Sequence, residues 1–246
     1  MKLMHSSVKG LCLKACLAFG LTSGITFIAA SPASAESLTS ELSRSRALLA
    51  QALSPGEQAN ASFQDKLSGS ALLNALKGGG YVIYFRHAQT ERDYADQADP
   101  NMSLGDCATQ RKLSKRGVQD ARDIGAAFTT KGIPVGKVIT SEYCRSWQTA
   151  NLAFGRVDKK DSRLNFLPYE DYTDDLVALM KKNVMPLLSA SVPSGTNIVI
   201  VGHDDIFEAA TGIYPDPQGI AYIAKPDGRG GFTLVANVLP SEWAAL

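Results

Sequence analysis

The 246-residue sequence has little histidine, cysteine and tryptophan, with 3, 4 and 2 residues respectively. Four cysteines are too few for the disulfide framework of a small secreted domain. Glycine and proline, at 21 and 11 residues, are too few for a low-complexity or collagen-like chain. The net charge is only +1, so no broad basic surface favours nucleic acid as a partner. With 45% hydrophobic and 20% charged residues, the composition is that of a packed globular protein.

The sequence has no hydrophobic run long enough to span a bilayer. The apolar run at residues 17–30 is about 14 residues long, and a membrane-spanning helix needs about 20. It follows a lysine-containing start and precedes residues 31–35, which end in Ala-x-Ala. This order is typical of a secretory signal peptide, so we expect cleavage after Ala35 and a periplasmic or secreted protein with no stable membrane span. The short run disfavours the alternative, an uncleaved membrane anchor.

Cleavage would leave Cys107 and Cys144 as the only cysteines. In the oxidising compartment that export implies, the two could form a disulfide. Two free buried thiols are an equal alternative, because the sequence does not give the distance between them.

Residues 36–62 form a polar N-terminal segment that we interpret as a helical extension or linker. Its leucines fall near helical spacing, and Ser54-Pro55-Gly56 predicts a break after a short helix, followed by a loop. The main domain is predicted to occupy residues 63–246.

Apolar runs alternate with amphipathic segments through the main domain. Three runs without polar alternation are typical of parallel strands buried on both faces, at 81–85, 137–140 and 197–201. Helical spacing predicts helices at 70–77, 114–129, 143–154 and 174–188. Two later strands are expected at 220–224 and 232–238. The pattern predicts an α/β protein, a three-layer α/β/α sandwich with a mostly parallel central sheet and an antiparallel pair at one edge.

The two histidines of the expected mature chain, His87 and His203, each follow a predicted buried strand. Arg86 precedes the first, and Arg145 lies at a predicted helix start after another strand. The carboxyl ends of parallel strands meet at one edge of a sheet, where ligands bind. Guanidinium groups and a helix start both favour phosphate and would repel a cation, so we expect neither a metal site nor a cofactor. The alternative for the histidines is a structural role in the core.

Several motifs resemble those of a known family. Arg86-His87-Ala88-Gln89-Thr90 resembles the Arg-His-Gly/Ala-x-Thr signature of the histidine phosphatase superfamily, which includes the phosphoglycerate mutases. Ser141-x-x-x-Arg145 and Gly202-His203 resemble its later motifs in order and spacing. The resemblance covers about residues 78 to 240. The residues around Asp106-Cys107 and Tyr143-Cys144 are similar to those of exported bacterial members, the lipopolysaccharide core heptose phosphate phosphatases.

The resemblance implies a metal-independent phosphomonoesterase. His87 would attack phosphorus and form a phosphohistidine that water hydrolyses, while Arg86, Arg145 and His203 hold the phosphate oxygens. The substrate would be a small phosphate ester, and the narrower resemblance points to an envelope phosphosugar. Ala88 departs from the usual glycine of the signature but removes no catalytic group. The alternatives are a phosphoglycerate mutase-like phosphotransferase and a non-catalytic module that binds phosphate or a phosphosugar.

The leaving oxygen also needs a proton donor. In one branch of the superfamily an aspartate directly after the second histidine supplies it, and Asp204 stands at that position. We therefore expect Asp204 to be catalytic. In the other branch the donor is a glutamate beyond the Ser-x-x-x-Arg motif. On position alone the remaining candidates are Glu142, Glu170, Asp171 and Glu208.

Overall fold

The computed structural model describes residues 53–91, 96, 99–167 and 171–246. The expected signal peptide, most of the 36–62 segment and Glu170 lie outside the described residues. The strands are β1 (Val82–Arg86), β2 (Val135–Thr140), β3 (Lys159–Lys160), β4 (Asn197–Gly202), β5 (Ala221–Pro226) and β6 (Phe232–Val238). The α-helices are α2 (Pro55–Ala61), α3 (Gly69–Gly78), α4 (Lys115–Lys131), α5 (Cys144–Phe154), α6 (Asp174–Leu188) and α7 (Asp204–Thr211). Short 3-10 helices are η2 (Cys107–Thr109), η3 (Ser162–Leu164) and η4 (Trp243–Ala245).

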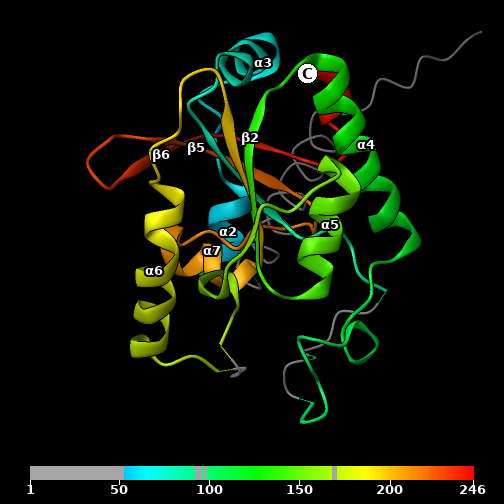
Figure 1. Ribbon diagram of the computed structural model, residues 1–246. Helices are drawn as coiled ribbons and strands as arrows, with labels where there is room; N and C mark the ends of the chain where they lie inside the picture. The colour runs from blue at the N-terminus through cyan, green and yellow to red at the C-terminus, as the bar shows by residue number, and fades with distance from the viewer. Residues whose placement is uncertain (1–52, 92–95, 97–98, 168–170) are drawn as a thin grey trace, which may run out of the picture. The chain divides into compact units, whose positions relative to one another are not determined.

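The strands form one sheet in the order β3-β2-β4-β1-β5-β6 (Figure 1). β1 and β2 pair with β4 in parallel, and β3 pairs with β2 in parallel. β5 runs antiparallel to both β1 and β6. The prediction of a mostly parallel sheet with an antiparallel pair at one edge is confirmed.

Helices cover both faces of the sheet. Side chains of β1 alternate between two cores, because successive residues of a strand point to opposite faces. Ile83 and Phe85 pack in the core beneath α3, α4 and η4, and Val82 and Tyr84 pack in the core beneath α6 and α7. Figure 1 shows α4 and α5 on one side of the sheet and α6 and α7 on the other. The three-layer arrangement is therefore confirmed.

The prediction of a loop after Ser54-Pro55-Gly56 is wrong, because a helix begins there. The Ser54 side chain accepts a hydrogen bond from the backbone N–H of Glu57, whose carboxylate accepts one from the Ser54 N–H. This capping box, with proline in the first turn where its missing N–H costs nothing, starts α2. Asn60 then joins α2 to the main domain, donating to the Asp216 carbonyl and accepting from the Tyr222 hydroxyl.

The close contact between α4 and α5 fixes the helix that carries Arg145. A Cβ atom on Gly125 of α4 would lie 2.0 Å from the carbonyl oxygen of Ala153 in α5, so only glycine permits this approach. α4 itself begins at Ser114, whose hydroxyl accepts from the Gly117 N–H, and ends at the left-handed Gly132. The start and stop of this helix follow the sequence signals.

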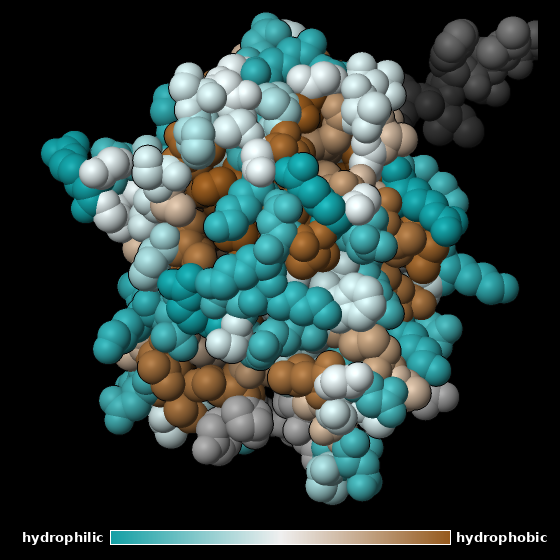
Figure 2. Space-filling view, viewed as in Figure 1, coloured by the Kyte–Doolittle hydropathy of each residue, from teal (hydrophilic) through white to brown (hydrophobic). Residues whose placement is uncertain are grey.

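The surface is mixed in polarity. Figure 2 shows mainly hydrophilic side chains on this face, with smaller hydrophobic patches between them. Over the described part of the chain, the large hydrophobic residues with exposed side chains are Leu53, Leu104 and Leu179. Within that same part, no helix combines the length and apolar character needed to cross a membrane.

Candidate active site

Three neighbouring parallel strands deliver the candidate residues to one edge of the sheet. Arg86, the last residue of β1, lies opposite Gly202, the last residue of β4. Beyond the strands the backbone pairing continues, since His87 N–H donates to the Gly202 carbonyl at 3.0 Å. Ser141 follows β2 in the same way, donating to the carbonyl of Val201. The β1 and β4 ends thus place His87 beside His203.

The hydrogen bonds of His87 define which ring nitrogen carries the lone pair. Nδ1 lies 2.9 Å from the carbonyl oxygen of Ala88, which can only accept, so Nδ1 carries the proton. Nε2 is then unprotonated, and Nε of Arg145 donates to it at 3.2 Å. This assignment comes from the hydrogen-bond pattern. It leaves the Nε2 lone pair on the side of the ring that faces Arg145.

His203 lies close to His87 and is held by a serine. The two ring centroids are 5.5 Å apart, and Ser141 Oγ lies 2.8 Å from Nε2 of His203. Tyr143 and Phe166 pack edge-on against the His203 ring. Nδ1 of His203 is buried and has no hydrogen-bond partner in the part of the chain that the structure covers. A ring held at Nε2 keeps Nδ1 available to a ligand.

Arg145 enters the site from the first turn of α5. Its guanidinium stacks over the rings of Tyr143 and Phe166, at 4.7 and 5.3 Å from the ring centroids. Nη1 donates to both carboxylate oxygens of Asp96, at 2.9 and 3.1 Å. Both side chains are almost completely buried. The stacking and the ion pair fix the guanidinium beside His87.

Arg86 is engaged by the first residue of α7 and by the segment that follows this helix. It pairs with the carboxylates of Asp204 and Asp216, at 2.5 and 3.1 Å, and also donates to the Pro215 carbonyl. Its guanidinium lies over the ring of Tyr214, 5.1 Å from the centroid. The charge of Arg86 still acts on His87, because it contributes to lowering the pKa of that imidazole.

Burial keeps both imidazoles neutral. Desolvation, followed by the charge of Arg145, lowers the pKa of His87 well below its ordinary value. The same two causes, in the same order, lower the pKa of His203. A neutral imidazole has a lone pair with which to attack, so this environment suits His87 to nucleophilic chemistry.

The expected hollow among these four residues is closed. Arg86, His87, Arg145 and His203 have between 0% and 2% of their surface exposed. Their surroundings are nevertheless polar, as the contacts above show. The sequence prediction that they converge agrees with this geometry, and the closure adds Asp96 as a group that sequence reasoning missed.

The acid candidates differ in their surroundings. Asp204 accepts from the Tyr214 hydroxyl at 2.8 Å and pairs with Arg86. Its neighbour Asp205, which sequence reasoning did not consider, has its pKa raised to about 6 by burial and by the charge of Asp204. Burial also raises the pKa of Glu208. Elsewhere, Glu142 accepts from the amide of Asn165, Asp171 is exposed, and Glu170 is among the residues not described.

Two further features near the site come from η2 and the residues after it. Cys107 and Cys144 form a disulfide with a Cα–Cα distance of 5.6 Å, which ties η2 to the residue before Arg145. Arg111 donates from Nη2 to the Thr90 hydroxyl at 2.7 Å, and its charge lowers the pKa of both histidines. The sequence showed Arg111 only as part of a basic cluster near a helix start, so its place at the site was not predicted.

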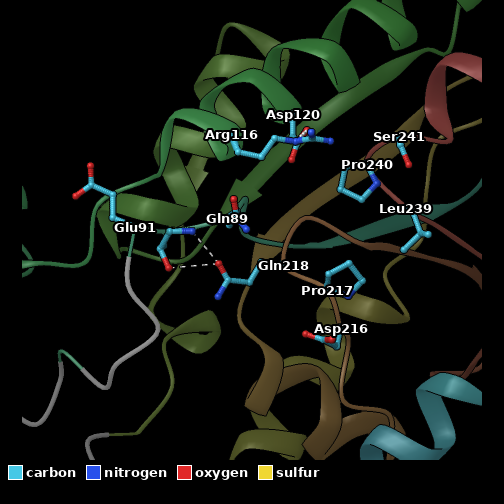
Figure 3. Close-up of a pocket in the computed structure, with 11 residues that line it drawn as sticks. Gln89, Glu91, Arg116, Asp120, Asp216, Pro217, Gln218, Leu239, Pro240 and Ser241 are labelled. Carbon is cyan, nitrogen blue, oxygen red and sulfur yellow. Dashed lines mark hydrogen bonds and ion pairs between the residues drawn. The ribbon is translucent and has the colours of Figure 1, made fainter.

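A cavity of about 670 Å³ adjoins the segment that follows His87 (Figure 3). Thr90 in its wall accepts a hydrogen bond from Arg111 and donates its backbone N–H to the side-chain oxygen of Gln218. Asp216, another wall residue, pairs with Arg86. The remaining polar lining comes from Gln89, Glu91, Arg116, Asp120 and Ser241. Two residues of the cavity wall thus contact arginines of the site: Thr90 contacts Arg111, and Asp216 contacts Arg86.

A metal-binding cluster of three or more histidine, cysteine, aspartate or glutamate side chains is not found where the structure describes the chain. No family model and no curated protein matches the sequence. Solved structures with a similar fold include the protein histidine phosphatase SixA complexed with tungstate, at 14% identity and a TM-score of 0.48, covering 66% of this chain and 98% of that one. Another is Bacillus stearothermophilus YhfR, at 17% identity and a TM-score of 0.45, covering 63% and 95%. A third is phosphoserine phosphatase from Entamoeba histolytica in complex with 3-phosphoglyceric acid, at 14% identity and a TM-score of 0.44, covering 64% and 95%.

Proposed function

We propose that the protein is a phosphatase of the histidine phosphatase superfamily, which hydrolyses a phosphate monoester through a phosphohistidine on His87. One observation carries the proposal: the unprotonated Nε2 of His87 lies 3.2 Å from Nε of Arg145, with His203 beside it. A neutral nucleophile among buried cationic and N–H donors is what attack on a phosphate requires.

The first chemical step is attack by the Nε2 lone pair of His87 on phosphorus. The bond from phosphorus to the leaving oxygen breaks, and that oxygen takes its electron pair and a proton from an acid. Arg145, Arg86 and Nδ1 of His203 stabilise the charge on the other phosphate oxygens. In the second step water attacks phosphorus and gives a proton to the carboxylate left by the first step, which restores the acid. The P–N bond breaks with its electron pair returning to Nε2, and the neutral imidazole and inorganic phosphate are released.

We assign the proton donation to Asp204, because it directly follows His203 at the position that the family resemblance indicates. Removal of the Asp204 carboxyl should lower the rate most for esters with a poor leaving group, because a good leaving group departs without a proton. Asp204→Asn should therefore slow hydrolysis of an alkyl phosphate far more than that of a nitrophenyl phosphate. The same comparison for Asp205→Asn tests the neighbouring carboxyl, and a selective loss in that variant would move the role to Asp205.

The organic part of the substrate is assigned to the cavity beside Thr90 and Gln218. Its lining offers amide, carboxylate, guanidinium and hydroxyl groups, which suit a ligand rich in hydroxyls such as a phosphosugar. The resemblance to lipopolysaccharide core heptose phosphate phosphatases supports an envelope phosphosugar. Gln218→Ala should raise KM for such a substrate and leave the KM for a small aryl phosphate nearly unchanged.

The protein is proposed to act in the periplasm or outside the cell. The signal-peptide pattern that ends at Ala35 supports export, as does the disulfide between Cys107 and Cys144, since disulfides persist in oxidising compartments. Mass spectrometry of the protein from fractionated cells tests this proposal. A mature N-terminus at Glu36 in the periplasmic fraction is expected, and a full-length protein in the cytoplasm would contradict it.

The direct test of activity is a panel of phosphate monoesters assayed with a chelator present. The wild-type protein should hydrolyse members of the panel, and His87→Ala should not, while the matched surface variant Gln119→Ala keeps full activity. Transfer of phosphate between phosphoglycerates would instead favour a mutase. Phosphate binding without turnover on any ester would favour a non-catalytic module.

A further inference from the structure

The Asp96 carboxylate accepts hydrogen bonds from groups of the kind that bind phosphate. Nη1 of Arg145 donates to both of its oxygens, at 2.9 and 3.1 Å, and the backbone N–H of Arg111 donates to Oδ2 at 2.8 Å. Asp96 is 1% exposed. A guanidinium and a backbone N–H are the donors that proteins use for phosphate oxygens. A carboxylate therefore occupies a phosphate-type donor set.

This donor set is next to the attacking nitrogen. The guanidinium that holds Asp96 through Nη1 also donates through Nε to Nε2 of His87. An anion bound at Nη1 therefore contacts the same guanidinium that contacts the nucleophile. A phosphate placed for attack by His87 would lie against the same guanidinium and compete with Asp96 for its positive charge.

Ion pairs offset much of the positive charge that a phosphate dianion would meet in the closed site. Arg145 is neutralised by Asp96, and Arg86 is paired with Asp204 and Asp216. Both imidazoles are neutral because burial lowers their pKa. A phosphate sharing Arg145 with Asp96 would bring two like charges together in a buried site, which is strongly unfavourable.

We propose that Asp96 is an internal anion that competes with phosphate for Arg145 and so sets the affinity of the site for phosphate. The proposal rests on the proposed function, since it takes Arg145 as a phosphate ligand. Substrate binding then includes the exchange of one anion for another on Nη1 of Arg145. A purely positioning role for Asp96 would have the opposite signature, because loss of its charge would then weaken phosphate binding.

Calorimetric titration with inorganic phosphate tests the competition without requiring turnover. Asp96→Asn keeps the size of the side chain and removes its charge, so it should bind phosphate about tenfold or more tightly than wild type. Asp99→Asn, an exposed carboxylate near it in sequence, is the matched control and should bind as wild type does. Equal or weaker binding by Asp96→Asn, with wild type binding, overturns the role of Asp96 and leaves the proposed function standing. Absence of phosphate binding in all three proteins overturns both.

A second measurement uses the unchanged protein, because Asp96→Asn leaves Arg145 without its counter-ion and could fail to fold. In a crystal structure of the wild-type protein with phosphate, the Asp96 oxygens should lie beyond hydrogen-bond distance of Nη1 of Arg145, with a phosphate oxygen in their place. Phosphate bound beside His87 with the Asp96–Arg145 pair intact would overturn the proposal. Phosphate bound only away from His87 would contradict the proposed function itself.

Discussion

Nε of Arg145 donates a hydrogen bond to Nε2 of His87 at 3.2 Å. An arginine at the start of α5 therefore faces the unprotonated ring nitrogen of the histidine that follows β1. An arginine in this position can stabilise the negative charge that develops on a phosphoryl group during attack. It also disfavours protonation of the imidazole, because a second positive charge there would be repelled.

Replacement of Arg145 should therefore affect turnover strongly. Arg145→Ala should lower kcat/KM by about 100-fold or more, as expected for loss of a donor aimed at transition-state charge. Arg145→Lys should recover only part of this loss, since an ammonium lacks the planar fork that reaches both His87 and an anion. Steady-state kinetics check this, with the exposed Arg156→Lys as the control. A loss below about threefold in Arg145→Ala would exclude a catalytic role.

The pH dependence of activity should lack an acid limb at the ordinary histidine pKa. The low pKa of His87 keeps it neutral as the pH falls through about 6.5, where an unperturbed histidine would become protonated. The kcat/KM profile, corrected for ionisation of the substrate, should therefore show no loss of activity as the pH is lowered from about 7 to about 5.5. NMR of the imidazole nitrogens supplies the site assignment. Protonation of His87 near pH 6.5 would show that the ring is not desolvated as described.

The disulfide should contribute substantially to stability. Cys107 and Cys144 are separated by 37 residues in the sequence, and closing a loop of that length is worth about 4 kcal/mol in the unfolded-chain model. The double variant Cys107→Ser/Cys144→Ser should lose about that much free energy of unfolding in urea. Reductant should bring wild type to the level of the variant and leave the variant unchanged. If reductant has no effect on wild type, the two cysteines are not bonded.

Gly202→Ala should damage both packing and the site. A Cβ at this position would lie 2.3 Å from the hydroxyl of Tyr84, a fully buried ring whose hydroxyl donates to the His203 carbonyl. The ring has no room to move, so the change should cost about 1–3 kcal/mol of stability. The free energy of unfolding, measured by chemical denaturation, and the activity should both decrease. Gly228→Ala, on the turn between β5 and β6, provides a comparison in which a Cβ meets no neighbour, although its positive φ adds some strain.

Asp205 should make stability fall with rising pH. Its carboxyl has a pKa of about 6 in the folded protein, above the value of about 3.9 in an unfolded chain. The folded state therefore binds the proton more tightly, and this contribution is lost as the pH rises from about 4 through about 6. Asp205→Asn has no carboxyl at this position and does not lose stability in this way as the pH rises. The free energy of unfolding of the variant minus that of wild type should therefore increase by about 1–2 kcal/mol between pH 4 and pH 7. A difference that does not change with pH would contradict the assignment.

Local sequence signals predicted most elements of the fold. The apolar runs gave β1, β2 and β4 to within two residues, and the 174–188 periodicity gave α6 with its observed ends. The error at Ser54-Pro55 arose because proline stops a helix in its interior but favours the first turn, and the Glu57 capping signal decides between these.

The two histidines, Arg86 and Arg145 were predictable because each lies at the end of a strand or at the start of a helix. Asp96 was not, since its role depends on Arg145, 49 residues later, and the sequence around it carries no periodic signal. Asp205 was overlooked for a related reason. Its raised pKa comes from burial in the first turn of α7 and from the neighbouring charge, and a solvated Asp-Asp pair would look the same in sequence.

The most direct test of the account is to stop the reaction during turnover and locate the covalent phosphate by mass spectrometry. The phosphohistidine mechanism predicts a phosphoryl group on His87 that is labile in acid and absent from the His87→Ala protein. Turnover with a phosphoryl group on any other residue, or turnover that persists unchanged in His87→Ala, would contradict it.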